Sequence, residues 1–171
     1  MNIILTRASV IFFFIVPLLL GLNSNIAFAL NTDKDQILQI IADSVELNHH
    51  TGVAIYRHHV HVSQGTTHLT ADKLTTTYDD QNQLESATAI GNKTRATYRT
   101  QTDIKKPELI AQADTIKYLP KQKLVQLIGN AQASQGTDTF IAPQINYDIQ
   151  NQIITSPPAE DGKTVITIQP K

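Results

Sequence analysis

Short runs of alternating apolar and polar residues, each closed by a turn signal, constrain the fold of this chain more than any other feature. In one such run Tyr56, Val60 and Val62 share one parity, and His59 and His61 share the other. This is the pattern of a strand with one apolar face and one wet face. Similar runs recur at intervals of roughly ten residues, without any long 3.6-residue apolar period. The alternation predicts an all-β chain of antiparallel strands.

An internal repeat narrows this prediction. The segments Ala42–Val45 and Ser63–Thr66 recur without a gap as Ala113–Ile116 and Ser134–Thr137, 71 residues later. A hairpin unit of this length cannot bury its apolar face alone, so successive units must stack into a continuous, curved pair of sheets. We therefore expect an open antiparallel β-jelly roll, which is a V-shaped β-sandwich built from repeated hairpins.

The first residues predict export. Arg7 precedes an apolar run, Ala8–Leu22, and small residues follow it up to Ala29, which is the pattern of a secretory signal peptide. The run is shorter than the roughly 20 residues of a membrane-spanning helix, which argues against the alternative of a retained anchor. We expect residues 1–29 to be a cleavable signal peptide and residues 30–171 to form one domain in the periplasm.

Composition excludes several classes of protein. Removal of Arg7 with the signal peptide leaves 13 Lys and Arg residues against 15 Asp and Glu residues, a balance that provides no positive field for nucleic acid. The chain has no Cys, so it cannot form a disulfide framework. After residue 29 the aromatic residues are Phe140 and five Tyr. The core must therefore consist mainly of aliphatic and small side chains.

The repeated elements resemble those of a known family. The segments that carry the resemblance are Ile40–Asp43, Val60–Gly65, Ala71–Lys73, Ala96–Tyr98 and Gly129–Ala131. Their order and spacing resemble the OstA-like family, and in particular its periplasmic lipopolysaccharide-transport members, over Gln36 to Gln169. One departure is His58-His59, which stands where the family usually has a Gly-Asn turn.

The resemblance implies a function that composition and periodicity do not show. Members of this family bind the lipid A part of lipopolysaccharide in a β-jelly roll and stack end to end as a bridge from the inner to the outer membrane. By resemblance, the edge of the first strand would accept LptC, which is anchored in the inner membrane. The edge of the last strand would reach LptD in the outer membrane, with head-to-tail self-association between. No cofactor is implied.

Alternation selects the side chains that would line an apolar trough between the two sheets. These positions are Leu38, Ile40, Val45, Leu47, Tyr56, Val60, Val62, Leu69, Leu74, Tyr98, Ile116, Tyr118, Leu127 and Phe140. Such a trough would shield acyl chains from water, at about 0.8 kcal/mol for each buried CH₂ group. The same side chains would also form a dry core, so core packing is the competing interpretation for each of them.

The two terminal strands are expected to be assembly edges. The predicted first strand, Gln36–Ile41, and the predicted last strand, Thr164–Gln169, contain no charge and no Pro. Soluble proteins usually blunt free edges with such residues, so their absence predicts pairing with neighbours by β-augmentation. The edge residues are Gln36, Ile37, Gln39, Ile41, Thr164, Val165, Ile166, Thr167 and Ile168. The alternative is a closed-barrel small-ligand binder or a structural envelope protein, which would need no such edges.

No catalytic or metal site is predicted. All six His fall between His49 and His68. His59 and His61 would share one strand face, a spacing that can hold Zn²⁺ or Cu²⁺, but no Cys joins them and the alternation favours a solvated row. The Asp79-Asp80 pair is predicted to form a turn. No nucleophile elbow or triad setting is present, so we expect the protein not to be an enzyme.

We expect the mature protein to begin at Leu30, because the small residues that end at Ala29 form the cleavage site. N-terminal sequencing of the protein recovered from a periplasmic fraction measures this directly. A mature chain that still carries Arg7 would contradict the prediction.

Overall fold

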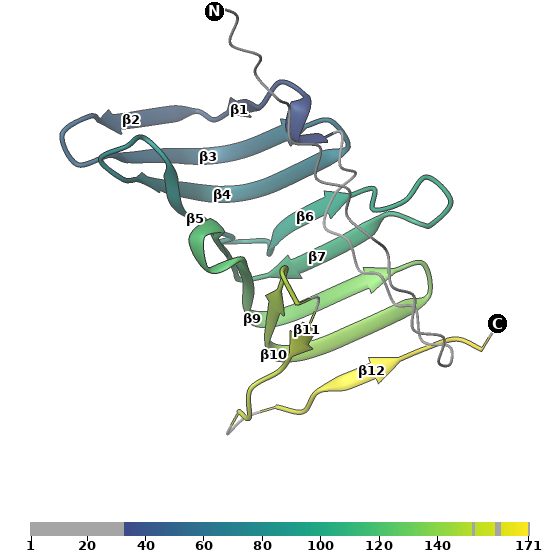
Figure 1. The fold of residues 1–171 in the computed structure, drawn as a ribbon. Coiled ribbons are helices and arrows are strands. Elements are labelled where there is room, and N and C mark those ends of the chain that lie inside the picture. Colours follow the sequence, from purple (N-terminus) through teal and green to yellow (C-terminus); the bar gives the residue numbers. More distant parts are fainter. Residues whose placement is uncertain (1–32, 152, 160–161, 171) are drawn as a thin grey trace, which may run out of the picture.

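The computed structural model describes residues 33–151, 153–159 and 162–170, so the predicted signal peptide lies outside the described residues. The strands are β1 (Gln39–Ile41), β2 (Ser44–Asn48), β3 (Val53–Gln64), β4 (Thr67–Tyr78), β5 (Leu84–Ile90), β6 (Ala96–Thr100), β7 (Leu109–Ala113), β8 (Thr115–Leu119), β9 (Leu124–Gln135), β10 (Asp138–Asp148), β11 (Ile153–Thr155) and β12 (Val165–Thr167). Two 3₁₀ turns, η1 (Asp33–Asp35) and η2 (Pro120–Gln122), complete the described elements. The predicted all-β antiparallel fold is confirmed (Figure 1).

The strands form one 12-stranded sheet in which the long strands change neighbours halfway along their length. The first half of β3 pairs with β2 and its second half with β1; β4 changes from β6 to β5, β9 from β8 to β7, and β10 from β12 to β11. We call the series β2–β3–β4–β5–β8–β9–β10–β11 the first wall. The second wall is β1–β3–β4–β6–β7–β9–β10–β12. The two walls meet at a fold line that crosses the four long strands.

A β-bulge marks the fold line in the first hairpin. His58 and His59 of β3 lie opposite the single residue Asp72 of β4, because the register shifts between Arg57 and Val60. Both His residues have positive φ, 61° and 48°. An extra residue of this kind bends a strand and increases its twist. The bulge therefore turns β3 and β4 from one wall into the other.

The second repeat forms the same bulge. Each end of β9 lies 71 residues after the corresponding end of β3, and Gly129 and Asn130 have φ values of 75° and 48°. They lie opposite Pro143 of β10, where the register shifts again; Pro is tolerated at a bulge because no ladder N–H is required there. The His58-His59 departure thus leaves the backbone conformation of the turn unchanged.

An Asp residue holds each bulge to the neighbouring strand. The backbone N–H of Asp43 donates to the carbonyl of His58 at 3.1 Å, and that of Asp114 donates to the carbonyl of Gly129 at 2.8 Å. The Asp43 carboxylate lies 2.8 Å from the His59 ring, and the Asp114 carboxylate accepts from the Asn130 amide at 2.9 Å. The Ala-Asp motif of the sequence therefore marks the fold line.

The terminal strands are shorter than the sequence predicts. Gln36 donates its N–H to the Asp33 carbonyl and closes η1, so β1 begins only at Gln39. At the other end the backbone N–H of Gln169 donates to the Asp138 side chain, and β12 covers Val165–Thr167. In both places the backbone N–H of a residue beyond the strand makes a hydrogen bond outside the ladder.

Gly129→Val should lower the free energy of unfolding by about 2–4 kcal/mol, because a β-branched residue is strained at positive φ and its Cβ would lie 2.5 Å from an Asp114 carboxylate oxygen. The matched control is His58→Gly at the equivalent position, where relief of positive φ should keep the change within about 1 kcal/mol. Urea unfolding measures both. Equal stability of Gly129→Val and the wild type would show that the bulge does not control the fold.

Candidate functional site

The inner surface of the folded sheet consists of rows of side chains that run from strand to strand. One row of the first wall is Leu47, Ala54, Thr76, Ala87, Tyr118, Val125, Tyr147 and Ile154, and the next is Val45, Tyr56, Leu74, Ala89, Ile116, Leu127 and Ile145. The main row of the second wall is Ile40, Val62, Leu69, Tyr98, Ala111, Ala133, Phe140 and Ile166. Both walls thus present almost entirely apolar side chains to their common interior.

The structure brings most of the predicted trough residues together. Ile40, Tyr56, Val60, Val62, Leu69, Leu74, Tyr98, Ile116, Leu127 and Phe140 all belong to the central apolar cluster or pack against it. The other four are more exposed: Leu38 at 55%, Val45 at 51%, Leu47 at 58% and Tyr118 at 36%. Val45, Leu47 and Tyr118 still lie on inner rows. Leu38 precedes β1 at the edge of the second wall.

Sequence reasoning missed the alanines along the fold line. Ala71, Ala96, Ala113, Ala131 and Ala142 lie there with Val60, and the exposed fraction of Ala96, Ala113 and Ala131 is 0%. Small side chains let the two walls approach closely, so the interior is closed along this line. For Ala71 and Ala113 the signal in the sequence was the Ala-Asp motif, which alternation alone does not distinguish from a solvated residue.

The environment of the Tyr side chains shows the low polarity of the interior. Burial raises the pKa of the Tyr98 and Tyr118 phenols, and it raises the pKa of Tyr147, which also lies beside Asp148. Removal from water disfavours the charged phenolate. The interior is therefore suited to apolar groups of a ligand and unsuited to charged groups.

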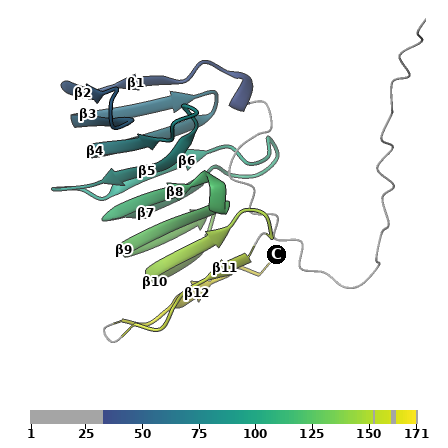
Figure 2. The same cartoon turned by 60° about the vertical axis from the view of Figure 1, so that its left-hand side comes forward.

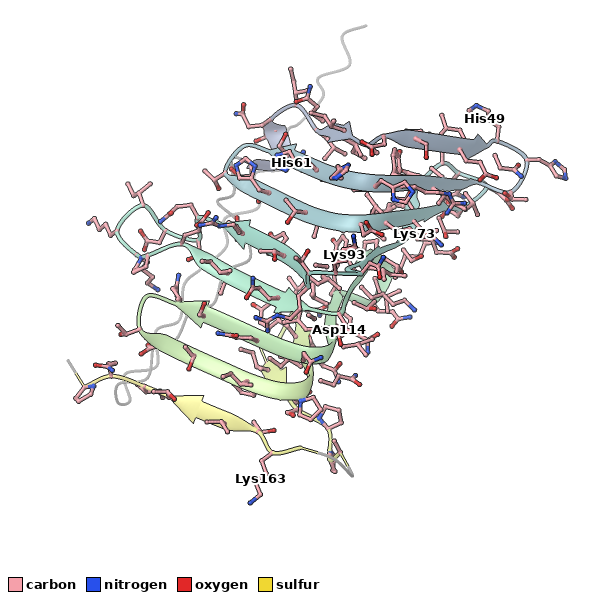
Figure 3. All side chains as sticks on the ribbon, turned by 180° about the vertical axis from the view of Figure 1, so that it is seen from behind. His49, His61, Lys73, Lys93, Asp114 and Lys163 are labelled. Atoms are coloured by element: carbon pink, nitrogen blue, oxygen red, sulfur yellow. The ribbon has the colours of Figure 1, made fainter. Side chains whose placement is uncertain are left out.

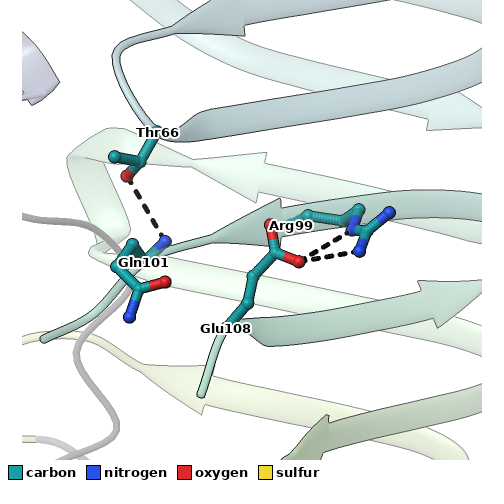
Figure 4. A network of polar contacts seen from close by, with 4 residues as sticks. All are labelled: Thr66, Arg99, Gln101 and Glu108. Atoms are coloured by element: carbon teal, nitrogen blue, oxygen red, sulfur yellow. Dashed lines mark hydrogen bonds and ion pairs between the residues drawn. The ribbon is translucent and has the colours of Figure 1, made fainter. Parts of the chain in front are cut away.

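Polar contacts hold the hairpin end of the second wall. The buried Asp33 carboxylate accepts hydrogen bonds from the Thr66 backbone N–H at 3.0 Å and from the Thr66 and Thr67 hydroxyls at 2.7 and 2.9 Å. Burial acts to raise the pKa of Asp33, but these hydrogen bonds lower it more, so that the pKa lies below its ordinary value. Thr66 also accepts from the Gln101 N–H (Figure 4). These bonds connect η1, the β3–β4 turn and the end of β6.

One inner residue has an unpaired polar atom. Thr76 is 5% exposed, and its hydroxyl is the only buried side-chain polar atom without a hydrogen-bond partner among the described residues. Its neighbours across the strands are Ala54 and Ala87. A buried hydroxyl without a partner destabilises the fold.

The predicted His residues lie on the outer face and in the turns. The rings of His61 and His68 stack with their centroids 5.6 Å apart, and His59 contacts Asp43. His49 lies in the turn between β2 and β3 (Figure 3). Within residues 33–151, 153–159 and 162–170, no three His, Asp or Glu side chains are placed to hold a metal ion.

An open hollow of about 670 Å³ borders one end of the first wall. Its lining includes the inner-row residues Leu47, Ala54 and Tyr56 and the turn residues His50 and Asp79. A second hollow, of about 630 Å³, lies over the outer side of the first bulge. The first hollow therefore gives solvent access to the apolar rows from the β2 end. Within the part of the chain that the structure describes, no helix has the length and hydropathy of a membrane span.

Comparison with known proteins yields a consistent result. The family described as "LptA/(LptD N-terminal domain) LPS transport protein" matches residues 39–153. The lipopolysaccharide export system protein LptH of Pseudomonas aeruginosa is 36% identical over 160 residues, which cover 91% of this chain and 90% of LptH. The protein LptA of Haemophilus influenzae, with the same description, is 27% identical over 146 residues, which cover 85% of this chain and 83% of LptA.

A solved structure agrees with these matches. The crystal structure of P. aeruginosa LptH, described as the LptA homologous periplasmic component of the conserved lipopolysaccharide transport device, superposes with a TM-score of 0.71 at 34% identity. The match covers 81% of this chain and 99% of the LptH chain. The similarity therefore extends over nearly all of the described fold.

Thr76→Val should raise the free energy of unfolding by about 1 kcal/mol, because it replaces an unpaired buried hydroxyl with a methyl group of similar size. The matched control is Thr75→Val on the outer face of the same strand, which should change stability by less than about 0.5 kcal/mol. Thermal or urea unfolding measures both. A clear loss of stability in Thr76→Val would mean that the hydroxyl is satisfied in solution.

Proposed function

Because the chain belongs to the LptA/LptD N-terminal-domain family of lipopolysaccharide transport proteins, we propose that it is a periplasmic carrier for lipopolysaccharide. The carrier holds the lipid A part in the trough between its two walls. Successive copies join end to end and form a bridge from the inner to the outer membrane. In this function the protein is a binding and conducting element that needs neither a cofactor nor a metal and catalyses no reaction.

The observation that carries the proposal is the continuity of the apolar interior. The same inner rows run without a charged residue from β1 and β2 at one end to β11 and β12 at the other. The described strands do not close into a barrel, since β1 and β12 each pair with one strand only. A closed-barrel binder is therefore disfavoured. An apolar channel open at both ends is suited to a ligand that must move onward.

The energetics of acyl-chain burial support the same function. A chain of ten methylene groups gains about 8 kcal/mol when it leaves water for an apolar surface. The interior is closed along the alanine row but accessible at Tyr118 and Leu47, which are 36% and 58% exposed. Acyl chains would therefore occupy the inner rows that lie farthest from the fold line, or they would push the two walls apart, with the sheet bending at the fold line. Their sugar and phosphate groups would stay in water.

The partners in this proposal come from the family resemblance, and the exposed edges support them. Ile37 and Ile41 at the β1 end are 88% and 53% exposed, and Val165 and Ile166 in β12 are 51% and 57% exposed. Large apolar side chains at free sheet edges favour association by strand pairing. We assign the β1–β2 edge to LptC at the inner membrane and the β11–β12 edge to LptD at the outer membrane. The two edges lie at opposite ends of the strand stack (Figure 2).

Tyr118→Asp should weaken lipopolysaccharide binding by about tenfold or more, because it places a charge on an inner row where acyl chains must lie. The control is His61→Asp, which adds the same charge on the outer face and should bind like the wild type. Binding is measured by titration of the purified mature proteins, with thermal melts to verify that each variant is folded. Equal binding by both variants would refute the assignment of the trough.

A further inference from the structure

The described chain consists of two six-strand units that use the same pairings. In the first unit, β3 pairs with β1 and β2, and β4 pairs with β5 and β6. In the second unit, β9 pairs with β7 and β8, and β10 pairs with β11 and β12. The fold is therefore an internal duplication, β1–β6 followed by β7–β12.

The two units meet at one internal junction. In the second wall β6 of the first unit pairs with β7 of the second, with Tyr98 opposite Ala111. In the first wall β5 pairs with β8, with Ala87 opposite Tyr118. The C-terminal strands of one unit thus pair with the N-terminal strands of the next. The same kinds of strands have a free edge at the two ends of the described chain.

Residues at the free ends match residues that the junction buries. Leu38 is equivalent to Leu109 of the second unit, and their exposed fractions are 55% and 3%. Val45 is equivalent to Ile116, and their exposed fractions are 51% and 7%. Exposed apolar side chains at a free edge indicate a surface that is covered in an assembly. The occupant that the repeat specifies is another copy of this chain.

We infer that the joint between two copies repeats the internal junction in the same register. This inference rests on the proposed end-to-end assembly and adds its geometry. Strands β5 and β6 pair with β4 as β11 and β12 pair with β10, so β5 is equivalent to β11 and β6 is equivalent to β12. Across the joint, Ile168 then faces Leu38 of the next copy, Thr167 faces Gln39, Ile166 faces Ile40, Val165 faces Ile41, and Ile154 faces Leu47. The inner rows of one copy continue into those of the next.

In this register, residues of the joint that differ in type from their equivalents at the internal junction differ on both sides in a matched way. At the internal junction the Gln112 amide donates to the Thr97 hydroxyl at 3.2 Å on the outer face. The equivalent residues of the joint are Ile41 and Val165, so a polar pair is replaced by an apolar pair on both sides at once. A register shifted by one residue would flip these side chains to opposite faces. The paired replacement therefore favours the unshifted register.

A charged contact of the internal junction is also replaced on both sides. The Arg99 guanidinium donates to the Glu108 carboxylate at 2.7 and 3.0 Å (Figure 4). The equivalent residues of the joint are Thr167 and Ile37, neither of which carries a charge. No unpaired charge is therefore left at this point of the joint. This contact should therefore add no salt dependence to the joint.

The joint lacks one hydrogen bond that the internal junction has. The Gly91 N–H donates to the Asp114 carbonyl at 2.9 Å on the fold line. When the alignment of β5 with β11 is extended past the end of β11, Gly91 corresponds to Pro158, which has no N–H. The joint should therefore be weaker than the internal junction and separable, as a bridge assembled from single copies requires.

Cysteine cross-linking tests the register, and the absence of native Cys makes the test clean. The mature variants Ile41→Cys and Val165→Cys are mixed, oxidised and separated on non-reducing gels. Directly opposed residues can form a disulfide, whereas a displacement by two residues places Cα atoms about 7–8 Å apart, beyond the reach of the bond. The off-register controls are Ile41→Cys with Thr167→Cys and Gln39→Cys with Val165→Cys.

We expect the on-register mixture to give at least tenfold more covalent dimer than either off-register mixture. Light scattering of the reduced proteins over a concentration series shows whether association persists. If the proteins associate but the off-register pairs cross-link as well as or better than the on-register pair, the register is wrong and the assembly stands. The same holds if the proteins associate and no pair cross-links. Absence of association in the wild type would overturn both the joint and the bridging part of the proposed function. Lipopolysaccharide binding by a single copy would then still be tested separately, by the comparison of Tyr118→Asp with its control.

Discussion

The structure depends on one backbone constraint, the pair of positive-φ residues opposite a single residue at the fold line. His58-His59 and Gly129-Asn130 each place one extra residue in a long strand. Without that residue each hairpin would continue as a flat ladder, and its apolar face would remain exposed. With it, the apolar residues of both halves turn toward one interior. On β4 the inward-facing side chains are accordingly those of odd-numbered residues up to Ala71 and those of even-numbered residues from Leu74 onward.

Small side chains make this bend compatible with close packing. Alanines occupy the positions where the walls converge, and larger residues such as Tyr98 and Phe140 lie farther from the fold line. The composition is consistent with this geometry, since the chain after residue 29 has no Trp, one Phe and five Tyr, and its interior consists mainly of aliphatic and small side chains. The side chains of the inner face thus become larger with distance from the fold line.

The internal duplication connects fold and assembly. Each six-strand unit has one N-terminal and one C-terminal edge, and the chain satisfies only the pair of edges at its centre. The edges at β1 and β12 are left with exposed Leu, Ile and Val side chains instead of charge or Pro. A carrier that extends by addition of copies needs this arrangement, because a bridge is the continuation of the repeat beyond the end of the chain.

The sequence by itself determined the strand class, the 71-residue repeat, the open jelly roll and ten inward-facing side chains that join the central apolar cluster, because alternation and turn chemistry are local properties. Only the tertiary structure decided where β1 and β12 begin and end, that alanines close the fold line, and that Val45, Leu47 and Tyr118 lie on inner rows while partly exposed. These features depend on which distant strands become neighbours. That choice is made by long-range packing of the two walls, which no local period encodes.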